Sequence, residues 1–135
     1  MQVHSIGLKS DNLLGIIETI KNGLPISAFD HFREKIELSE KALSKTMDIS
    51  KRTLTRRKHE GRLSPLESEK LVRLASLFDK AAEVFGDDEN LAAQWFKTPA
   101  RGLAGKTPME MAETEIGARE VHALLVRIGH GIFPG

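Results

Sequence analysis

Signals that begin and end α-helices recur along the whole chain, and this pattern restricts the fold more than any other feature of the sequence. Most stretches with apolar residues at helical spacing follow a Ser, Thr, Asp or Asn and stop near a Gly or Pro. Two starts, at Ser64 and Thr107, have the Pro and Glu of a capping box, and Ser27 is the expected cap of the second helix. We therefore expect an all-α fold with helices at about 13–22, 28–37, 40–46, 51–59, 65–85, 88–97 and 115–129. The segment from Val3 to Leu8 is a short and weak strand candidate.

The composition excludes several classes of protein. The 135 residues include no cysteine, which excludes a disulfide scaffold and cysteine chemistry. No apolar stretch approaches the ~20 residues of a membrane helix, and the first residues lack the pattern of a secretory signal. No two of the five histidines have the four-residue spacing of metal ligands on a helix. We expect a cytoplasmic protein without a metal or cofactor.

Basic residues are concentrated in one short segment. The net charge is +1, from 20 Lys and Arg against 19 Asp and Glu, but residues 51–62 hold six basic residues and one acidic residue. Such a local patch attracts phosphates even when the whole protein is nearly neutral. A basic, solvated helix face without a DNA role is the alternative.

This segment has the pattern of a helix-turn-helix. Two short helices flank a turn at 47–50, and Leu43, Met47, Ile49 and Leu54 can form their shared apolar core. With Leu54 on the buried side, ~100° per residue places four residues on the opposite, exposed side of the second helix. These are Arg52, Thr55, Arg56 and His59.

That exposed side has the geometry of a helix that enters the major groove, where Arg reads base edges bidentately. Ser50 and Lys51 lie at the helix start, where backbone N–H groups also favour a phosphate. Arg57, Lys58 and Arg62 lie to the side and suit phosphate contacts. The sequence therefore predicts a DNA-binding surface at Ser50, Lys51, Arg52, Thr55, Arg56, Arg57, Lys58 and His59.

A long helix is expected to join two lobes. Leu71, Leu74, Phe78 and Ala81 recur at steps of three and four, and further apolar residues widen the stripe. The stripe is either ordinary core or, in part, a homodimer contact. We expect an N-terminal extension at 1–12, a helix-turn-helix domain at 13–64, a connecting helix at 65–86 and a small helical lobe at 87–135.

Residues 100–107 fit a relaxed phosphate-loop pattern that ends in Lys106 and Thr107. A true phosphate loop follows a buried strand, and the preceding residues form an amphipathic helix pattern instead. We interpret this segment as a glycine-containing turn before a capped helix. A nucleotide-binding enzyme is the less favoured alternative.

The C-terminal segment has features of a protein-binding surface. Val121, Leu124, Leu125 and Ile128 form an apolar face, and an apolar tail at 132–135 follows Gly131. The tail either folds back on its own core or enters a pocket of a partner. Charged residues on the last helix can form the polar rim of such an interface, and they are Arg119, Glu120, His122 and Arg127.

Taken in order, these motifs resemble one family. Besides the helix-turn-helix, they are Leu63-Ser-Pro-Leu-Glu-Ser68, Phe85-Gly-Asp87, Trp95 with Thr98-Pro99, Gly105-Lys-Thr-Pro108, Thr114-Glu-Ile-Gly-Ala-Arg-Glu-Val121 and Arg127-Ile-Gly-His-Gly-Ile-Phe133. Over about residues 13–135 the chain resembles the Xre-type antitoxins of bacterial toxin–antitoxin pairs, those with an Xre/MbcA/ParS toxin-binding domain. It departs at 109–112, where Leu-rich sequence is common, and at Gly129, where Glu is common.

The resemblance implies a function and two partners. The C-terminal lobe would bind a RES-domain toxin that degrades NAD and would hinder access to the toxin's NAD site. The implied toxin contacts are Arg119, His122, Arg127, His130, Ile132, Phe133, Pro134 and Gly135. The helix-turn-helix would repress the protein's own operon by binding operator DNA, usually as a homodimer, and the chain would not be an enzyme. A helix-turn-helix regulator controlled by a small ligand is the alternative.

Overall fold

The structure is a computed structural model, and it describes residues 4–7 and 12–131. All regular structure in this part of the chain is helical, so the all-α prediction is confirmed. The elements are η1 (His4–Ile6), α1 (Leu13–Asn22), α2 (Ile26–Ile36), α3 (Glu40–Thr46), α4 (Lys51–Glu60), α5 (Pro65–Val84), α6 (Glu89–Phe96), η2 (Arg101–Leu103), α7 (Pro108–Met111) and α8 (Glu115–Gly129). None of these helices is long and apolar enough to cross a membrane.

The predicted caps explain most helix starts. The side chains of Asn12, Ser39, Ser50, Ser64, Asp88, Thr107 and Thr114 each accept a hydrogen bond from a backbone N–H in the first turn. Both predicted capping boxes form, with Glu67 and Glu110 as the returning carboxylates.

The predicted start of the second helix is wrong by two residues. α2 begins at Ile26, directly after Pro25, and Ser27 lies inside the helix. Pro25 has the extended backbone of a helix cap, with φ −61° and ψ 147°. The N–H of Ile26 donates to the carbonyl of Gly61 at 3.0 Å, so this helix start needs no side-chain cap.

The weak strand candidate is also wrong for the residues that the structure describes, because 4–6 form a turn of 3₁₀ helix. Ile6 is buried against the core, and the hydroxyl of Ser5 donates to the carbonyl of Ala75 at 3.3 Å. No strand forms within 4–7 and 12–131 to pair with this segment. Val3 and Leu8 lie outside the described residues.

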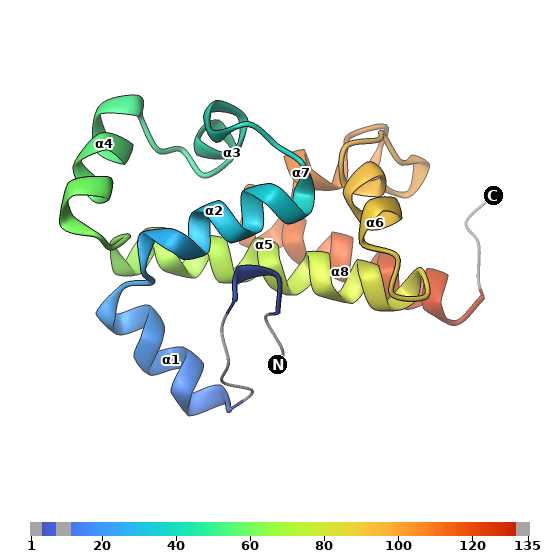
Figure 1. Cartoon of the computed structure of the whole chain (residues 1–135). Coiled ribbons are helices and arrows are strands. Elements are labelled where there is room, and N and C mark those ends of the chain that lie inside the picture. The colour runs from blue at the N-terminus through green and yellow to red at the C-terminus, as the bar shows by residue number, and fades with distance from the viewer. Residues whose placement is uncertain (1–3, 8–11, 132–135) are drawn as a thin grey trace.

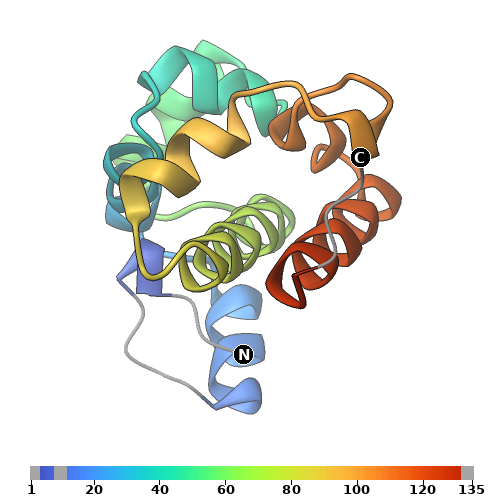
Figure 2. The same cartoon turned by 90° about the vertical axis from the view of Figure 1, so that its right-hand side faces the viewer.

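α5 is the central helix of a shared hydrophobic core. In Figure 1 it crosses the molecule with α3 and α4 on one side and α1 on the other, and Figure 2 shows α8 running beside it. Phe78 lies at its middle and contacts Phe32 of α2 and Phe96 of α6, with ring centroids 5.9 and 6.1 Å apart. The predicted apolar stripe of α5 is buried from Leu71 to Ala81. The long helix therefore organises both halves of the chain rather than only connecting them.

Candidate nucleic-acid interface and partner-binding surface

The helix-turn-helix forms as predicted from α3, the turn at 47–50 and α4 (Figure 1). Leu43, Met47, Ile49 and Leu54 are at most 6% exposed and make the shared core. Asp48 has the left-handed φ of 57° that the tight turn requires. The N–H of Ile49 donates a hydrogen bond to the carbonyl of Ser44 at 2.8 Å. This geometry fixes the second helix relative to the first.

The outer side of α4 carries most of the predicted DNA-contacting residues. Lys51, Arg52, Thr55, Arg56 and His59 are all exposed on this side. Arg56 has a side chain that is 63% exposed, and it makes a long ion pair of 3.6 Å with Glu60 on the next turn. A weak surface pair of this kind does not prevent a contact with DNA.

Arg57 lies elsewhere, although the sequence assigned it to the same surface. Its side chain is 15% exposed and forms an ion pair with Glu67 of α5. Arg57 Nε lies 2.7 Å from Glu67 Oε1, and Arg57 Nη2 lies 3.0 Å from Glu67 Oε2. The hydrogen bond that Arg57 donates to Glu67 raises the pKa of Arg57, against the opposing effect of burial. Arg57 therefore joins α4 to α5 and faces away from the exposed outer side of α4.

Two further basic residues of the predicted patch also have partners within the fold. The Lys58 ammonium lies 2.8 Å from both carboxylate oxygens of Glu40 on α3. Arg62 donates to the carbonyl of Gly23 at 3.0 Å. Lys58 remains 46% exposed, so a phosphate can compete with Glu40 for it.

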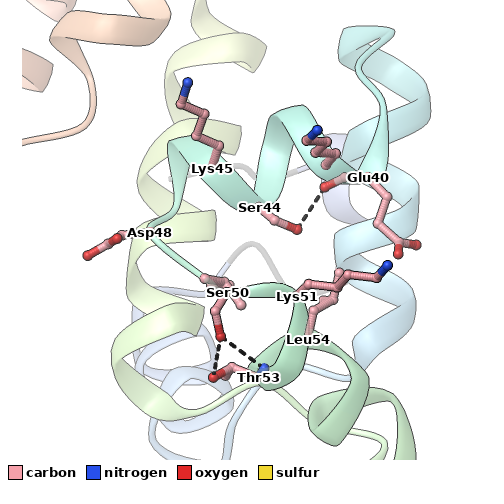
Figure 3. Close-up of a pocket in the computed structure, with 10 residues that line it drawn as sticks. Glu40, Ser44, Lys45, Asp48, Ser50, Lys51, Thr53 and Leu54 are labelled. Carbon is pink, nitrogen blue, oxygen red and sulfur yellow. Dashed lines mark hydrogen bonds between the residues drawn. The ribbon is translucent and has the colours of Figure 1, made fainter.

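A cleft of about 730 Å³ separates α3 from the beginning of α4 (Figure 3). Lys41 and Lys45 of α3 line it together with Ser50 and Lys51 of α4. Figure 3 labels Lys45, Ser50 and Lys51 there, and two of its dashed lines mark the hydrogen bonds between the Ser50 cap and Thr53. In helix-turn-helix proteins the first helix crosses the phosphate backbone. Lys41 and Lys45 are therefore candidate phosphate contacts.

These two lysines were not among the predicted contacts, because the basic residues of the chain are densest in 51–62. Their spacing of four residues, on the helix before the turn, was the available signal.

The last helix, α8, buries the predicted apolar face and exposes the predicted charged residues. Val121, Leu124 and Leu125 are at most 2% exposed. Arg119, His122, Arg127 and His130 are exposed, the last as the helix cap. Arg119 pairs with Glu115 at 3.0 Å, and both side chains are more than two-thirds exposed. The predicted tail, Ile132 to Gly135, lies outside the described residues.

Ile116 is an exposed residue of α8 that is not among the predicted toxin contacts. It is 76% exposed and lies one helical turn before Arg119. Single exposed apolar side chains are common on protein surfaces, so Ile116 is a candidate contact only because it lies beside the predicted toxin contact Arg119. Its place opposite the Val121 and Leu125 face was visible in the sequence.

Residues 100–107 form a turn, as the favoured interpretation of that segment predicted. η2 is followed by Ala104 and Gly105 in left-handed conformation. The N–H groups of Gly105 and Lys106 donate to carbonyls within the turn, at 3.0 and 3.1 Å, so they do not form a phosphate cradle. Within the described ranges, no group of three or more His, Asp or Glu residues could hold a metal ion.

Comparison with known proteins assigns both halves of the chain. Residues 15–76 match the antitoxin Xre-like helix-turn-helix domain, and residues 80–131 match the antitoxin Xre/MbcA/ParS C-terminal toxin-binding domain. The antitoxin Xre of Yersinia enterocolitica is 35% identical over 95% of this chain and 87% of its own length. The antitoxin Xre of Photorhabdus laumondii is 32% identical over the same shares, and that of Pseudomonas putida is 35% identical over 48% of this chain and 40% of its own length. The chain therefore belongs to the Xre family of antitoxins.

Proposed function

We propose that this protein neutralises a RES-domain toxin that degrades NAD and represses its own operon through the α3–α4 helix-turn-helix. The supporting observation is the separation of its two candidate surfaces along α5. Glu67, which holds Arg57 of α4, and Val84, which lies beside Gly129 at the end of α8, are about 26 Å apart along the helix axis. Arg119 lies nearer the α4 end, beside Glu69 and Arg73. The end of α8 is therefore far enough from α4 for DNA and a toxin to be bound at the same time. Antitoxins are a non-enzymatic family, so the chain is not an enzyme.

DNA recognition would use two kinds of contact. Arg52 and Arg56 project from the outer side of α4 and would read base edges, each good guanine contact giving ~1–3 kcal/mol of discrimination. Lys41, Lys45 and Lys51 would bind phosphates beside the cleft and position the helix without reading sequence. One chain carries one such helix, so an operator with two half-sites needs a homodimer.

Toxin binding would use the exposed side of α8 and the residues that follow it. Ile116 offers an apolar contact, and Arg119, Arg127 and His130 supply the polar surroundings. The apolar tail at 132–135 would enter the toxin and hinder access to its NAD site. The toxin's NAD chemistry takes place in the toxin alone.

Two variants test this division of roles. The double substitution R52A/R56A should abolish operator binding yet still protect cells that express the toxin of the neighbouring gene, with cellular NAD preserved. Removal of residues 132–135 should do the reverse, with operator binding intact and NAD lost. A chain that co-purifies with no toxin, or that protects cells equally without its tail, would contradict the proposal. Release from the operator by a small molecule would favour a ligand-controlled regulator instead.

A further inference from the structure

α1, α5 and α8 enclose an apolar groove of about 400 Å³, and its α8 edge includes two of the expected toxin contacts, Arg119 and His122. Leu13 and Ile17 of α1, Val72 and Leu77 of α5, and Ala118 of α8 supply apolar walls. Figure 2 shows α1 (blue) below α5 and α8 (red) beside it, and both helices contact α5. The groove thus combines α1 and part of α5 from the helix-turn-helix region with α8 from the toxin-binding region.

α1 leaves an unusual amount of apolar surface uncovered beside this groove. Leu13, Leu14 and Ile17 are 57, 70 and 37% exposed. They are half of the six large apolar side chains that are exposed in the described part of the chain. α1 is ten residues long, and Ile16 is its one buried residue, so the helix leaves most of its apolar side chains uncovered. This face is therefore a candidate for burial against another chain.

Charges of both signs surround the groove. Glu69 and Arg73 project from α5, and Glu115, Arg119 and His122 project from α8. The Nε of Arg73 and the Oγ of Ser76 are buried without a hydrogen-bond partner. A two-fold interface brings one patch onto an identical patch, so it requires this mixture of signs. A surface built for a strongly acidic or basic partner would carry one sign.

The position of the groove is compatible with DNA binding. Figures 1 and 2 both place α1 on the opposite side of α5 from α3 and α4. An occupant of the groove therefore leaves the cleft and the outer side of α4 open. A single chain presents one recognition helix, so the operator-reading site is incomplete until a second copy is held beside the first.

We propose that the groove holds α1 of a second copy of this chain, with Leu13, Leu14 and Ile17 of each copy packed against the other. The two α1 helices lie side by side across the two-fold axis. The inference rests on the proposed repressor function, because that function requires two copies on one operator. It adds the surface through which the copies associate.

Sedimentation velocity on the full chain tests the interface. Wild type should be a dimer, and L14E or I17E should weaken dimerisation by a factor on the order of 100, because a carboxylate would be buried without a partner. L91E is the matched control, since Leu91 is 44% exposed on α6 outside the groove, and it should stay dimeric. Far-UV circular dichroism should be the same for all variants. A wild-type monomer, or an L14E dimer as stable as wild type, would overturn the proposal.

Cysteine cross-linking keeps the test independent of folding effects. The natural chain has no cysteine, so any disulfide in L14C must join two chains. Oxidised L14C should give a covalent dimer, and oxidised L91C should not; equal cross-linking of the two variants would refute the α1 contact.

DNA and toxin assays separate this inference from the proposed function. L14E should lose affinity for a full operator but keep wild-type affinity for a single half-site. Absence of operator binding in wild type would refute the repressor function while leaving the sedimentation result valid. An L14E chain that remains dimeric but no longer neutralises the toxin would assign the groove to the toxin and overturn the inference.

Discussion

Arg57 and Glu67 form a two-point ion pair in which both guanidinium–carboxylate distances are 3.0 Å or less. The same Glu67 carboxylate accepts the N–H of Ser64 at 2.9 Å and completes the capping box of α5. One carboxylate thus caps the beginning of α5 and holds α4 in its orientation relative to α5. A cation from the most basic segment of the chain therefore contributes to the packing of α4 on α5.

Arg57→Ala should therefore destabilise the protein, by about 1–3 kcal/mol in the free energy of unfolding, because Glu67 would keep a half-buried charge without its main partner. Arg56→Ala is the matched control, one residue away and 63% exposed, and should change stability by less than about 0.5 kcal/mol. Urea unfolding followed by circular dichroism measures both. Equal losses in the two variants would contradict the structural role.

The same pair should make stability depend on pH. Burial by itself raises the pKa of Glu67, but hydrogen bonds from Arg57 and from the N–H of Ser64 outweigh it and hold the pKa below its ordinary 4.5. A lowered carboxyl pKa adds stability that is fully present above the unfolded pKa and is lost as pH falls through the folded one. The stability advantage of wild type over Glu67→Gln should hold at neutral pH and shrink below about pH 4.5. A constant difference down to about pH 3 would show that Glu67 titrates alike in the folded and unfolded chain.

Lys45→Ala should weaken binding to operator and to unrelated DNA by the same factor, because a phosphate contact carries no sequence information. The slope of log affinity against log salt should fall by about 0.9 for the lost contact. Lys106→Ala, an exposed lysine in the turn before α7, should leave the slope unchanged. Loss of sequence discrimination in Lys45→Ala would instead mean that α3 reaches base edges.

The sequence predicted what depends on local chemistry and on helical period. Ser50, Ser64 and Thr107 cap helices in any context that lets their side chains reach the next backbone N–H groups. Leu54 is the apolar residue of an otherwise polar helix, so it turns toward the core. The residues on the opposite side of the helix, Arg52 and Arg56, are then exposed. The helix-turn-helix was therefore predictable almost residue by residue.

The contacts that could not be predicted from the sequence join residues that lie on different helices. Glu67 is ten residues from Arg57, and its carboxylate had an obvious role in the capping box, so the second partner was invisible before α4 and α5 were placed. Pro25 replaced Ser27 at the start of α2 because Gly61, far along the chain, satisfies the N–H of Ile26. The groove beside α1 likewise requires α8 to lie next to α5, which no local pattern predicts.

Two glycines of α8 should respond to alanine in opposite ways. A Cβ on Gly117 would overlap the carbonyl oxygen of Met111, so Gly117→Ala must push the start of α8 away from α7. We expect a loss of about 1–3 kcal/mol in the free energy of unfolding and weaker toxin neutralisation, since Ile116 and Arg119 move with the helix.

A Cβ on Gly129 would meet only Val84 Cγ2, at 3.4 Å, which is an ordinary contact. Gly129→Ala should therefore raise the free energy of unfolding by about 0.5 kcal/mol through helix propensity. Thermal unfolding of the two variants against wild type measures both signs, and a stabilised Gly117→Ala would show that α7 and α8 do not meet as described.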